Sequence, residues 1–136
     1  MPVVDASVWV ALCHAGDRHH ERSKRWLEAR LLEGERLTAP TLLPVEVAAA
    51  VRRLTGDEGL AEAAASSLGK LEAIELFDLD ADRSRRAAAI ASATGVRGAD
   101  AVYLELAAHR RDVLVTWDRQ QLERGGTVAR VETPSP

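Results

Sequence analysis

Four acidic residues stand at positions where the surrounding sequence is otherwise apolar. Asp5 ends the run Met1–Val4, and Glu46 is the only charged residue between positions 41 and 51. Asp100 lies at the start of an apolar helical pattern, and Asp118 lies two residues beyond another apolar run. A buried or half-buried carboxylate is costly unless it is paired or binds a cation. These four residues are therefore the first candidates for a functional site.

The chemistry open to these acids depends on whether they converge in space. Four close carboxylates repel one another, so some would take up protons near neutral pH unless a divalent cation relieved the repulsion. Oxygen ligands without a His or Cys set favour Mg²⁺ or Mn²⁺. Such an ion can lower the pKa of a bound water and stabilise charge on a phosphate. If they converge, the acids predict hydrolysis of phosphodiester bonds.

Each acid also has a structural interpretation, which spacing alone leaves open. Asp5 and Asp118 could cap the helical segments that follow them. Asp100 could favour the positive end of its helix. Glu46 could be a solvated helix residue.

Candidate contacts to a phosphate backbone come from arginine. Of the 18 basic residues all but Lys24 and Lys70 are arginine, the residue suited to bidentate phosphate contacts. Arg97, Arg52 and Arg53 are candidates to bind RNA in this way, which would position it without reading its sequence. A solvated helix face is the alternative for each of them.

The elements that must position these residues alternate between two patterns. Short apolar runs predict strands, and longer runs with helical spacing predict helices between them. The predicted strands are Pro2–Asp5, Arg36–Ala39, Ile74–Leu79, Val113–Thr116 and Val128–Val131. The predicted helices are Ser7–Ala15 with Ser7 as its N-cap, Arg18–Glu33, Leu42–Leu54, Gly59–Leu71, Ala81–Thr94, Ala99–Arg111 and a short turn at Arg119–Arg124.

This alternation predicts an α/β sandwich with a parallel sheet and helices on both faces. Sites in such sheets form beyond the carboxyl ends of the strands, where the strand order reverses. Asp5 and Asp118 would face each other there if the first and fourth strands are neighbours. We expect a single domain over residues 1–132 and a disordered tail over 133–136.

Composition excludes several classes of protein. A chain of 136 residues can bury a core without disulfides or structural zinc, and its single cysteine cannot form an internal disulfide. The net charge of −3 does not indicate nucleic-acid binding. No apolar run is long enough to cross a membrane, and the N-terminus lacks signal-peptide character. We expect a soluble cytoplasmic protein.

The four acids in their local contexts resemble the PIN-domain nucleases, most closely the VapC-type toxins of bacterial toxin–antitoxin systems. The resemblance rests on Val4-Asp5-Ala6-Ser7-Val8-Trp9, Glu46 in a helix after Ala39-Pro40, Gly98-Ala99-Asp100-Ala101 and Val115-Thr116-Trp117-Asp118. It covers the chain from Val3 to about Val131.

The resemblance implies a three-layer α/β/α fold with strand order 3-2-1-4-5. It implies that Asp5, Glu46, Asp100 and Asp118 bind Mg²⁺ or Mn²⁺ as the catalytic set, with Ser7 and Thr116 as supporting hydroxyls. It also implies an endoribonuclease toxin, a homodimer and a cognate antitoxin. Some members carry a further acid at the position of Gln120, and this chain departs from them there. We therefore expect one firmly held metal, and a second only when substrate is bound.

Other functions fit the same fold class. A PIN nuclease of RNA processing and a non-catalytic RNA-binding PIN module remain alternatives, although degenerate members usually lose acids that this chain keeps. A phosphoacceptor receiver domain needs an acidic pair after the first strand, where Asp5 stands alone. An aspartate-nucleophile phosphatase needs Asp-x-Asp, and Ser7 occupies the second position.

Overall fold

A computed structural model describes residues 1–135 of the chain. Its strands are β1 (Val3–Val4), β2 (Leu37–Pro40), β3 (Ile74–Phe77), β4 (Leu114–Val115) and β5 (Val131–Glu132). Its α-helices are α1 (Ala6–Cys13), α2 (His20–Leu32), α3 (Leu43–Thr55), α4 (Glu58–Lys70), α5 (Ala81–Thr94), α6 (Gly98–Arg110) and α7 (Arg119–Arg124), and a 3₁₀ turn, η1, spans Gly125–Thr127.

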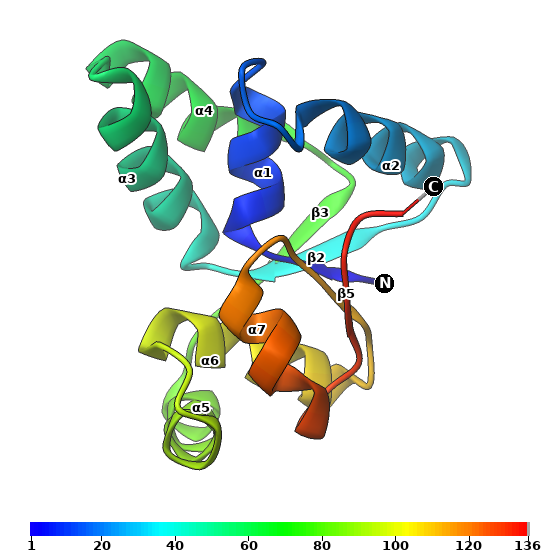
Figure 1. The fold of residues 1–136 in the computed structure, drawn as a ribbon, viewed down its shortest axis with the longest axis vertical. Coiled ribbons are helices and arrows are strands. Elements are labelled where there is room, and N and C mark those ends of the chain that lie inside the picture. Colours follow the sequence, from blue (N-terminus) through cyan, green and yellow to red (C-terminus); the bar gives the residue numbers. More distant parts are fainter. Residues whose placement is uncertain (136) are drawn as a thin grey trace.

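The strands form one parallel sheet in the order β3-β2-β1-β4-β5. Helices α1 to α4 lie on one side of the sheet and α5 to α7 on the other (Figure 1). The predicted fold class and strand order are therefore confirmed. Because β1 pairs with both β2 and β4, the strand order reverses beside β1, and the carboxyl ends of β1 and β4 meet at one edge.

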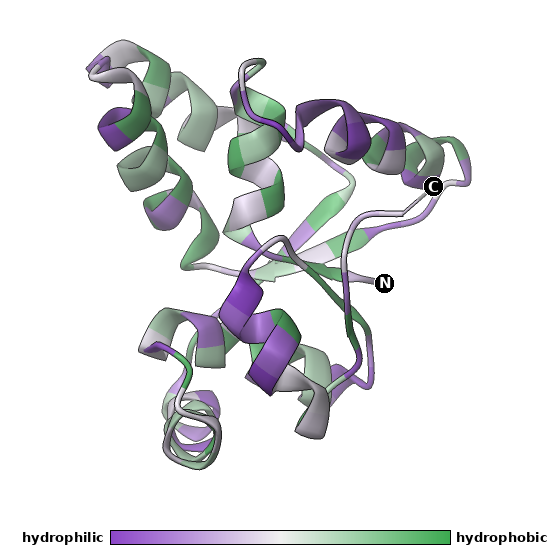
Figure 2. Ribbon diagram, in the orientation of Figure 1, coloured by the Kyte–Doolittle hydropathy of each residue, from purple (hydrophilic) through white to green (hydrophobic). Residues whose placement is uncertain are grey.

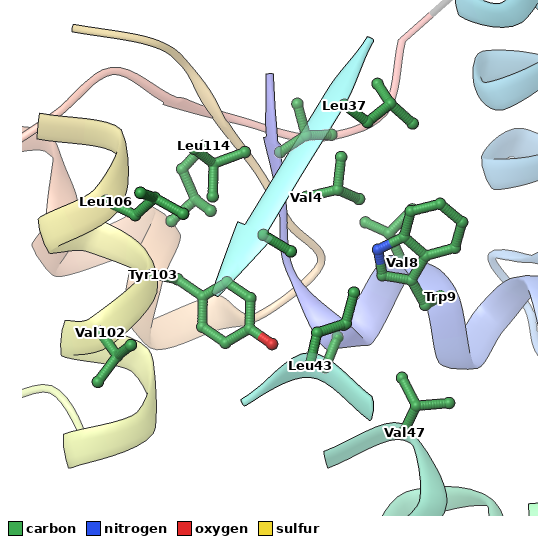
Figure 3. Packing of buried hydrophobic residues seen from close by; sticks show 14 of the residues in the cluster. Val4, Val8, Trp9, Leu37, Leu43, Val47, Val102, Tyr103, Leu106 and Leu114 are labelled. Atoms are coloured by element: carbon green, nitrogen blue, oxygen red, sulfur yellow. The ribbon is translucent and has the colours of Figure 1, made fainter. Parts of the chain in front are cut away.

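The core lies on both faces of the central strands. Val3 and Val4 are fully buried, as expected for a strand covered by helices on both sides. Figure 3 shows Tyr103 of α6 beside the sheet, with its hydroxyl directed toward Leu43 at the start of α3. The outer surfaces are more polar, and α2 is largely hydrophilic along its length (Figure 2). The buried valines fix the register of β1 and therefore the position of Asp5 directly after it.

The other predicted strands and helices are present with ends within two residues of those predicted, but two local predictions are wrong. The fifth strand is Val131–Glu132 rather than Val128–Val131, because the amides of Val128 and Ala129 bond back to the carbonyl of Gly125 and extend the turn. The N-cap of α1 is Asp5 rather than Ser7, since the helix begins at Ala6 and Asp5 accepts a hydrogen bond from the Ser7 amide. A longer segment thus separates α7 from β5, and Ser7 is free for another role.

The C-terminal residues follow β5 without regular structure. Pro134 is buried, and its carbonyl accepts a hydrogen bond of 3.3 Å from Arg22 of α2. The disorder predicted for residues 133–136 and the domain limit at 132 stay predictions, and Pro136 lies outside the described residues. Within residues 1–135, no helix is long and apolar enough to span a membrane.

Candidate active site

The four acids come from four different elements and line one open pocket of about 450 Å³. Asp5 follows β1, Glu46 lies in the first turn of α3, and Asp100 lies in the first turn of α6. Asp118 follows β4 as the N-cap of α7. The pocket therefore opens at the carboxyl edge of β1 and β4, where a parallel sheet leaves room for a site.

Asp5 and Asp118 each cap a helix and also line the pocket, which are the two roles that the sequence left open. Asp5 Oδ2 accepts the amide of Ser7 at 3.0 Å, and Asp118 Oδ1 accepts the amide of Gln121 at 2.9 Å. Each is thus a helix cap, which holds its carboxylate in a fixed direction. Both also line the pocket, so the capping role does not remove them from the site.

The hydroxyls of Ser7 and Thr116 connect the ends of β1 and β4. Thr116 is fully buried, and its Oγ1 lies 3.1 Å from Asp5 Oδ2 and accepts the Asp118 amide at 2.9 Å. Ser7 Oγ lies 3.2 Å from Thr116 Oγ1 and accepts the Trp117 amide at 2.9 Å. Thr116 therefore contacts the Asp5 carboxylate directly and holds the backbone of Asp118, while Ser7 fixes Thr116 and the backbone of Trp117.

Gln121 belongs to the same network, and the sequence analysis missed it. Its side chain is fully buried, with Oε1 2.7 Å from Thr116 Oγ1 and Nε2 3.4 Å from Asp5 Oδ1. The single Thr116 hydroxyl proton can be donated to Gln121 Oε1 or to Asp5 Oδ2, so the amide and carboxylate share it. The signal available in the sequence was the Asp-x-x-Gln spacing from Asp118, which is that of a capping box.

Two of the acids are held in an environment that disfavours their charged form. Burial raises the pKa of Glu46, and the negative charges of Asp5 and Asp100 raise it further. Burial also raises the pKa of Asp100, followed by the charge of Asp118, while Arg97 opposes the shift. These mutual effects mean that the four carboxylates interact electrostatically across the pocket.

Glu46 has an unused ligand atom. Its Oε1 is buried and has no hydrogen-bond partner within the described chain, and the buried Tyr103 hydroxyl has none there either. The nearby Tyr103 hydroxyl lowers the pKa of Glu46, but less than burial raises it. Burial and the charge of Glu46 in turn raise the pKa of Tyr103. A buried oxygen without a partner is costly, so this one has capacity for a ligand.

Arg97 already provides a positive charge to two of the acids. Its Nε lies 3.1 Å from Asp100 Oδ2, and its Nη2 lies 2.8 Å from Asp118 Oδ2. These contacts raise the pKa of Arg97, the hydrogen bond to Asp100 first. Among residues 1–135 no group of three or more His, Cys, Asp or Glu side chains forms a ready-made metal cluster. Arg97 is therefore a tethered counter-ion for Asp100 and Asp118 in this arrangement.

The other two candidate arginines lie differently. Arg53 lines the pocket from α3, whereas Arg52 turns toward the end of its own helix and donates to the carbonyl of Gly56. Of the three arginines singled out from the sequence, the structure thus brings Arg97 and Arg53 to the acids and leaves Arg52 away from them.

The sequence that forms this site matches a known protein family. Residues 3–126, most of the chain, match the PIN domain family. The chain belongs to the PIN domain family. No curated protein sequence matches it.

Several solved structures share the fold of this PIN domain. Mycobacterium tuberculosis VapC20, described as a sarcin–ricin loop cleaving toxin, is 20% identical, with a TM-score of 0.77 over 88% of this chain and 91% of VapC20. VapBC2 of Rickettsia felis, solved with a promoter DNA fragment, is 12% identical, with a TM-score of 0.73 over 98% of each chain. A toxin–antitoxin complex of Klebsiella pneumoniae is 18% identical, with a TM-score of 0.71 over 99% of this chain and 98% of the chain in that complex.

The residues of this PIN domain fit a hard divalent cation. The pocket is lined by five carboxylates, the four acids and Asp17, and by no cysteine, which is the oxygen-rich ligand set that Mg²⁺ and Mn²⁺ prefer. The unpartnered Glu46 Oε1 and the raised pKa values of Glu46 and Asp100 are both relieved by a nearby positive charge. These carboxylates are therefore the residues that would hold such a cation, although within residues 1–135 they do not form a ready-made cluster for one.

Proposed function

We propose that this PIN domain is a Mg²⁺- or Mn²⁺-dependent endoribonuclease and the toxin of a VapBC-type toxin–antitoxin pair. The observation that supports it most strongly is one pocket holding four interacting carboxylates, two with raised pKa values and one with an unpartnered oxygen. The VapC and VapBC structures that share its fold favour a toxin over a PIN nuclease of RNA processing. Retention of all four acids argues against a non-catalytic RNA-binding module.

In this proposal Asp5, Glu46, Asp100 and Asp118 hold the cation. When bound, a divalent cation lowers the pKa of a water and stabilises charge that develops on the phosphate. Hydrolysis of RNA would then leave a 5′-phosphate and a 3′-hydroxyl. An endonuclease needs a site that a phosphodiester within a chain can reach, and this pocket is open to solvent.

The remaining groups position the ligands and the substrate. Ser7, Thr116 and Gln121 keep the Asp5 and Asp118 carboxylates in place through the bonds described above. Arg97, once released from Asp100 and Asp118, and Arg53 can contact phosphates of the RNA. Arg52 is left as a weaker candidate because its side chain faces Gly56.

The proposed partners follow from the same assignment. A toxin of this kind would be held inactive by a cognate antitoxin and would act as a homodimer in the cytoplasm, where its RNA substrate lies. The toxin assignment predicts that expression of this chain without an antitoxin arrests bacterial growth. Asp100→Asn should relieve the arrest, because it removes one charge from the cation site. Equal arrest by the wild type and a stably expressed Asp100→Asn protein would contradict the assignment.

Replacing Gln121 should weaken metal binding while the fold persists. We expect Gln121→Met to raise the Mn²⁺ dissociation constant by about 10- to 100-fold, the usual effect of removing a group that orders a metal ligand. Isothermal titration calorimetry measures this directly. The matched control is Gln120→Met, at a position that does not line the pocket, which should bind Mn²⁺ like the wild type. Equal affinity in both variants would contradict a positioning role for Gln121.

Stabilisation by Mg²⁺ should depend on pH. The pKa values of Glu46 and Asp100 are raised in the folded state, so without metal the folded state binds more protons than the unfolded state above the ordinary carboxyl range. Their contribution to the metal-free stability therefore falls as pH rises through that window. Mg²⁺ needs the ionised carboxylates, so its binding competes with those protons.

The measurement is the melting temperature with and without Mg²⁺ at about pH 5 and about pH 8. At the higher pH, Mg²⁺ about a hundredfold above its dissociation constant should add about 2.7 kcal/mol to the free energy of unfolding. We expect a clearly smaller Mg²⁺-induced shift at the lower pH. A shift that is equal at both values, or larger at the lower one, would contradict the proposed ligand set.

A further inference from the structure

An aromatic pair lines the same pocket beside the acids. The rings of His19 and Trp117 are stacked, with centroids 3.8 Å apart and planes within 8° of parallel. Both residues line the pocket that holds the four carboxylates. Trp117 directly precedes Asp118 in the chain, so the stack begins one residue from a proposed metal ligand.

Trp117 is held firmly in this position. Its indole Nε1 donates to Oγ of the buried Ser23 at 2.8 Å, and its backbone amide donates to Ser7 Oγ at 2.9 Å. The guanidinium of Arg22 lies 4.9 Å from the centre of the ring. The ring is therefore fixed between α2 and the end of β4, and it provides a rigid support for whatever stacks on it.

His19 is fixed as well, at the edge of α2. Its backbone amide donates to Asp17 Oδ1 at 2.7 Å, and its Nε2 accepts from Arg18 Nε at 3.1 Å. Burial and the neighbouring Arg18 lower the pKa of His19, which favours a neutral ring. The ring is partly exposed and lines the pocket, with one face covered by Trp117. A neutral, flat and preorganised ring is the surface that an unpaired base stacks on.

We propose that the His19 ring, backed by Trp117, is a stacking platform for one unpaired nucleobase of a single-stranded RNA whose phosphate lies at the acids. This inference rests on the proposed ribonuclease function and deepens it, because it names the residues that would contact a base of the substrate. A base inside a duplex has both faces occupied and cannot reach the platform, so the site selects loops and other unpaired segments. Stacking of this kind accepts any base, so the platform confers preference for single strands rather than for a sequence.

The test separates the contribution of the base from that of the phosphates. Two fluorescein-labelled strands of about ten nucleotides are compared by fluorescence anisotropy, a uridine RNA and an abasic ribose-phosphate strand of equal length. Ca²⁺ replaces Mg²⁺ as the oxygen-binding cation, and strand integrity is checked on a gel. The wild-type protein should bind the uridine strand about 5- to 150-fold more tightly than the abasic strand, the range expected for stacking of one base.

Variants at His19 assign this difference to the platform. His19→Leu should remove most of the base-dependent gain and leave affinity for the abasic strand unchanged, whereas His19→Phe should keep the gain because it restores an aromatic ring. His109→Leu, at an exposed histidine away from the pocket, is the matched control and should behave like the wild type. Circular dichroism confirms that each variant is folded.

The outcomes distinguish failure of the proposed stacking platform from failure of the proposed nuclease function. A base-dependent gain that survives His19→Leu, or a wild type that binds neither strand, would overturn the platform. Cleavage of a longer RNA is assayed with Mg²⁺ on the same wild-type preparation. Absence of cleavage together with a gain lost in His19→Leu would overturn the nuclease and retain the platform. Cleavage together with a base-dependent gain that does not depend on His19 would retain the nuclease and overturn the platform.

Discussion

Asp5→Asn should lower the rate of RNA cleavage by the purified protein by about 10²- to 10³-fold, the loss typical when one group that stabilises a transition state is removed. Asn keeps the shape of the side chain and is itself a good helix N-cap, so the cap on α1 is retained while the negative charge is lost. The effect therefore reports on the charge at the centre of the site. The measurement is a time course of cleavage of a labelled RNA with Mg²⁺.

Two controls accompany this prediction. Asp82→Asn makes the same substitution at an exposed residue of α5 that does not line the pocket, and it should cleave RNA at the wild-type rate. Wild-type protein in EDTA should lose activity as completely as Asp5→Asn. Cleavage that survives both Asp5→Asn and EDTA would contradict the proposed metal-dependent mechanism.

Glu105→Ala should be the most destabilising of the substitutions considered, with a loss of about 3 kcal/mol in the free energy of unfolding. The side chain of Glu105 is only 2% exposed and joins α6 to α5 through Arg83 at 3.2 Å and Arg86 at 2.8 Å. Its removal leaves two arginines without their carboxylate, and Arg83 is itself largely buried. The loss stays below the upper end for buried pairs because Arg86 is 43% exposed and can turn toward water.

Urea denaturation followed by circular dichroism measures this change. The matched control is Glu123→Ala, whose carboxylate pairs with the exposed Arg119 at the surface of α7, and we expect it to change stability by no more than about 0.5 kcal/mol. Equal losses for the two variants would contradict the structural role of the α5–α6 ion pairs. Glu105 lies outside the pocket of the four acids, so any loss of cleavage by its variant should follow the loss of folded protein.

The sheet could be predicted because buried strands, and their alternation with helices along the chain, leave local patterns in the sequence. Short apolar runs such as Val3–Val4 between amphipathic helices are enough to indicate a parallel sheet, and the family resemblance supplied its strand order. The fifth strand was misplaced because Val128 lies in an apolar run but belongs to a turn bonded to Gly125. A hydrophobic pattern cannot distinguish a strand from a turn in this segment, because the hydrogen bonds that decide between them are made by backbone atoms.

The candidate site was predictable only as a set of residue types. Asp5, Glu46, Asp100 and Asp118 were chosen because each interrupts an apolar context, which is a local property of the sequence. Several of the contacts that connect these acids are long-range and leave no local signal. Thr116 reaches Asp5 across 111 positions, and Arg97, which pairs locally with Asp100, also reaches Asp118 across 21 positions.

Two parts of the site were missed for related reasons. Nothing in the local sequence singles out His19, since a stack with Trp117 nearly a hundred positions away cannot be read from the chain. Gln121 is buried although glutamine is usually exposed, because Thr116 donates a hydrogen bond to its amide oxygen and Asp5 accepts one from its amide nitrogen. Both depend on the packing of α2 and α7 against the ends of β1 and β4.

The most direct test of the central claim is the position of a bound cation. Crystals of the protein grown with Mn²⁺ and measured near the manganese absorption edge should give an anomalous peak within bonding distance of Asp5 and Asp100, with Arg97 moved away from Asp100. The same peak should be absent from crystals of Asp5→Asn. A wild-type map with no peak among the four carboxylates, under conditions in which the protein cleaves RNA, would contradict the account.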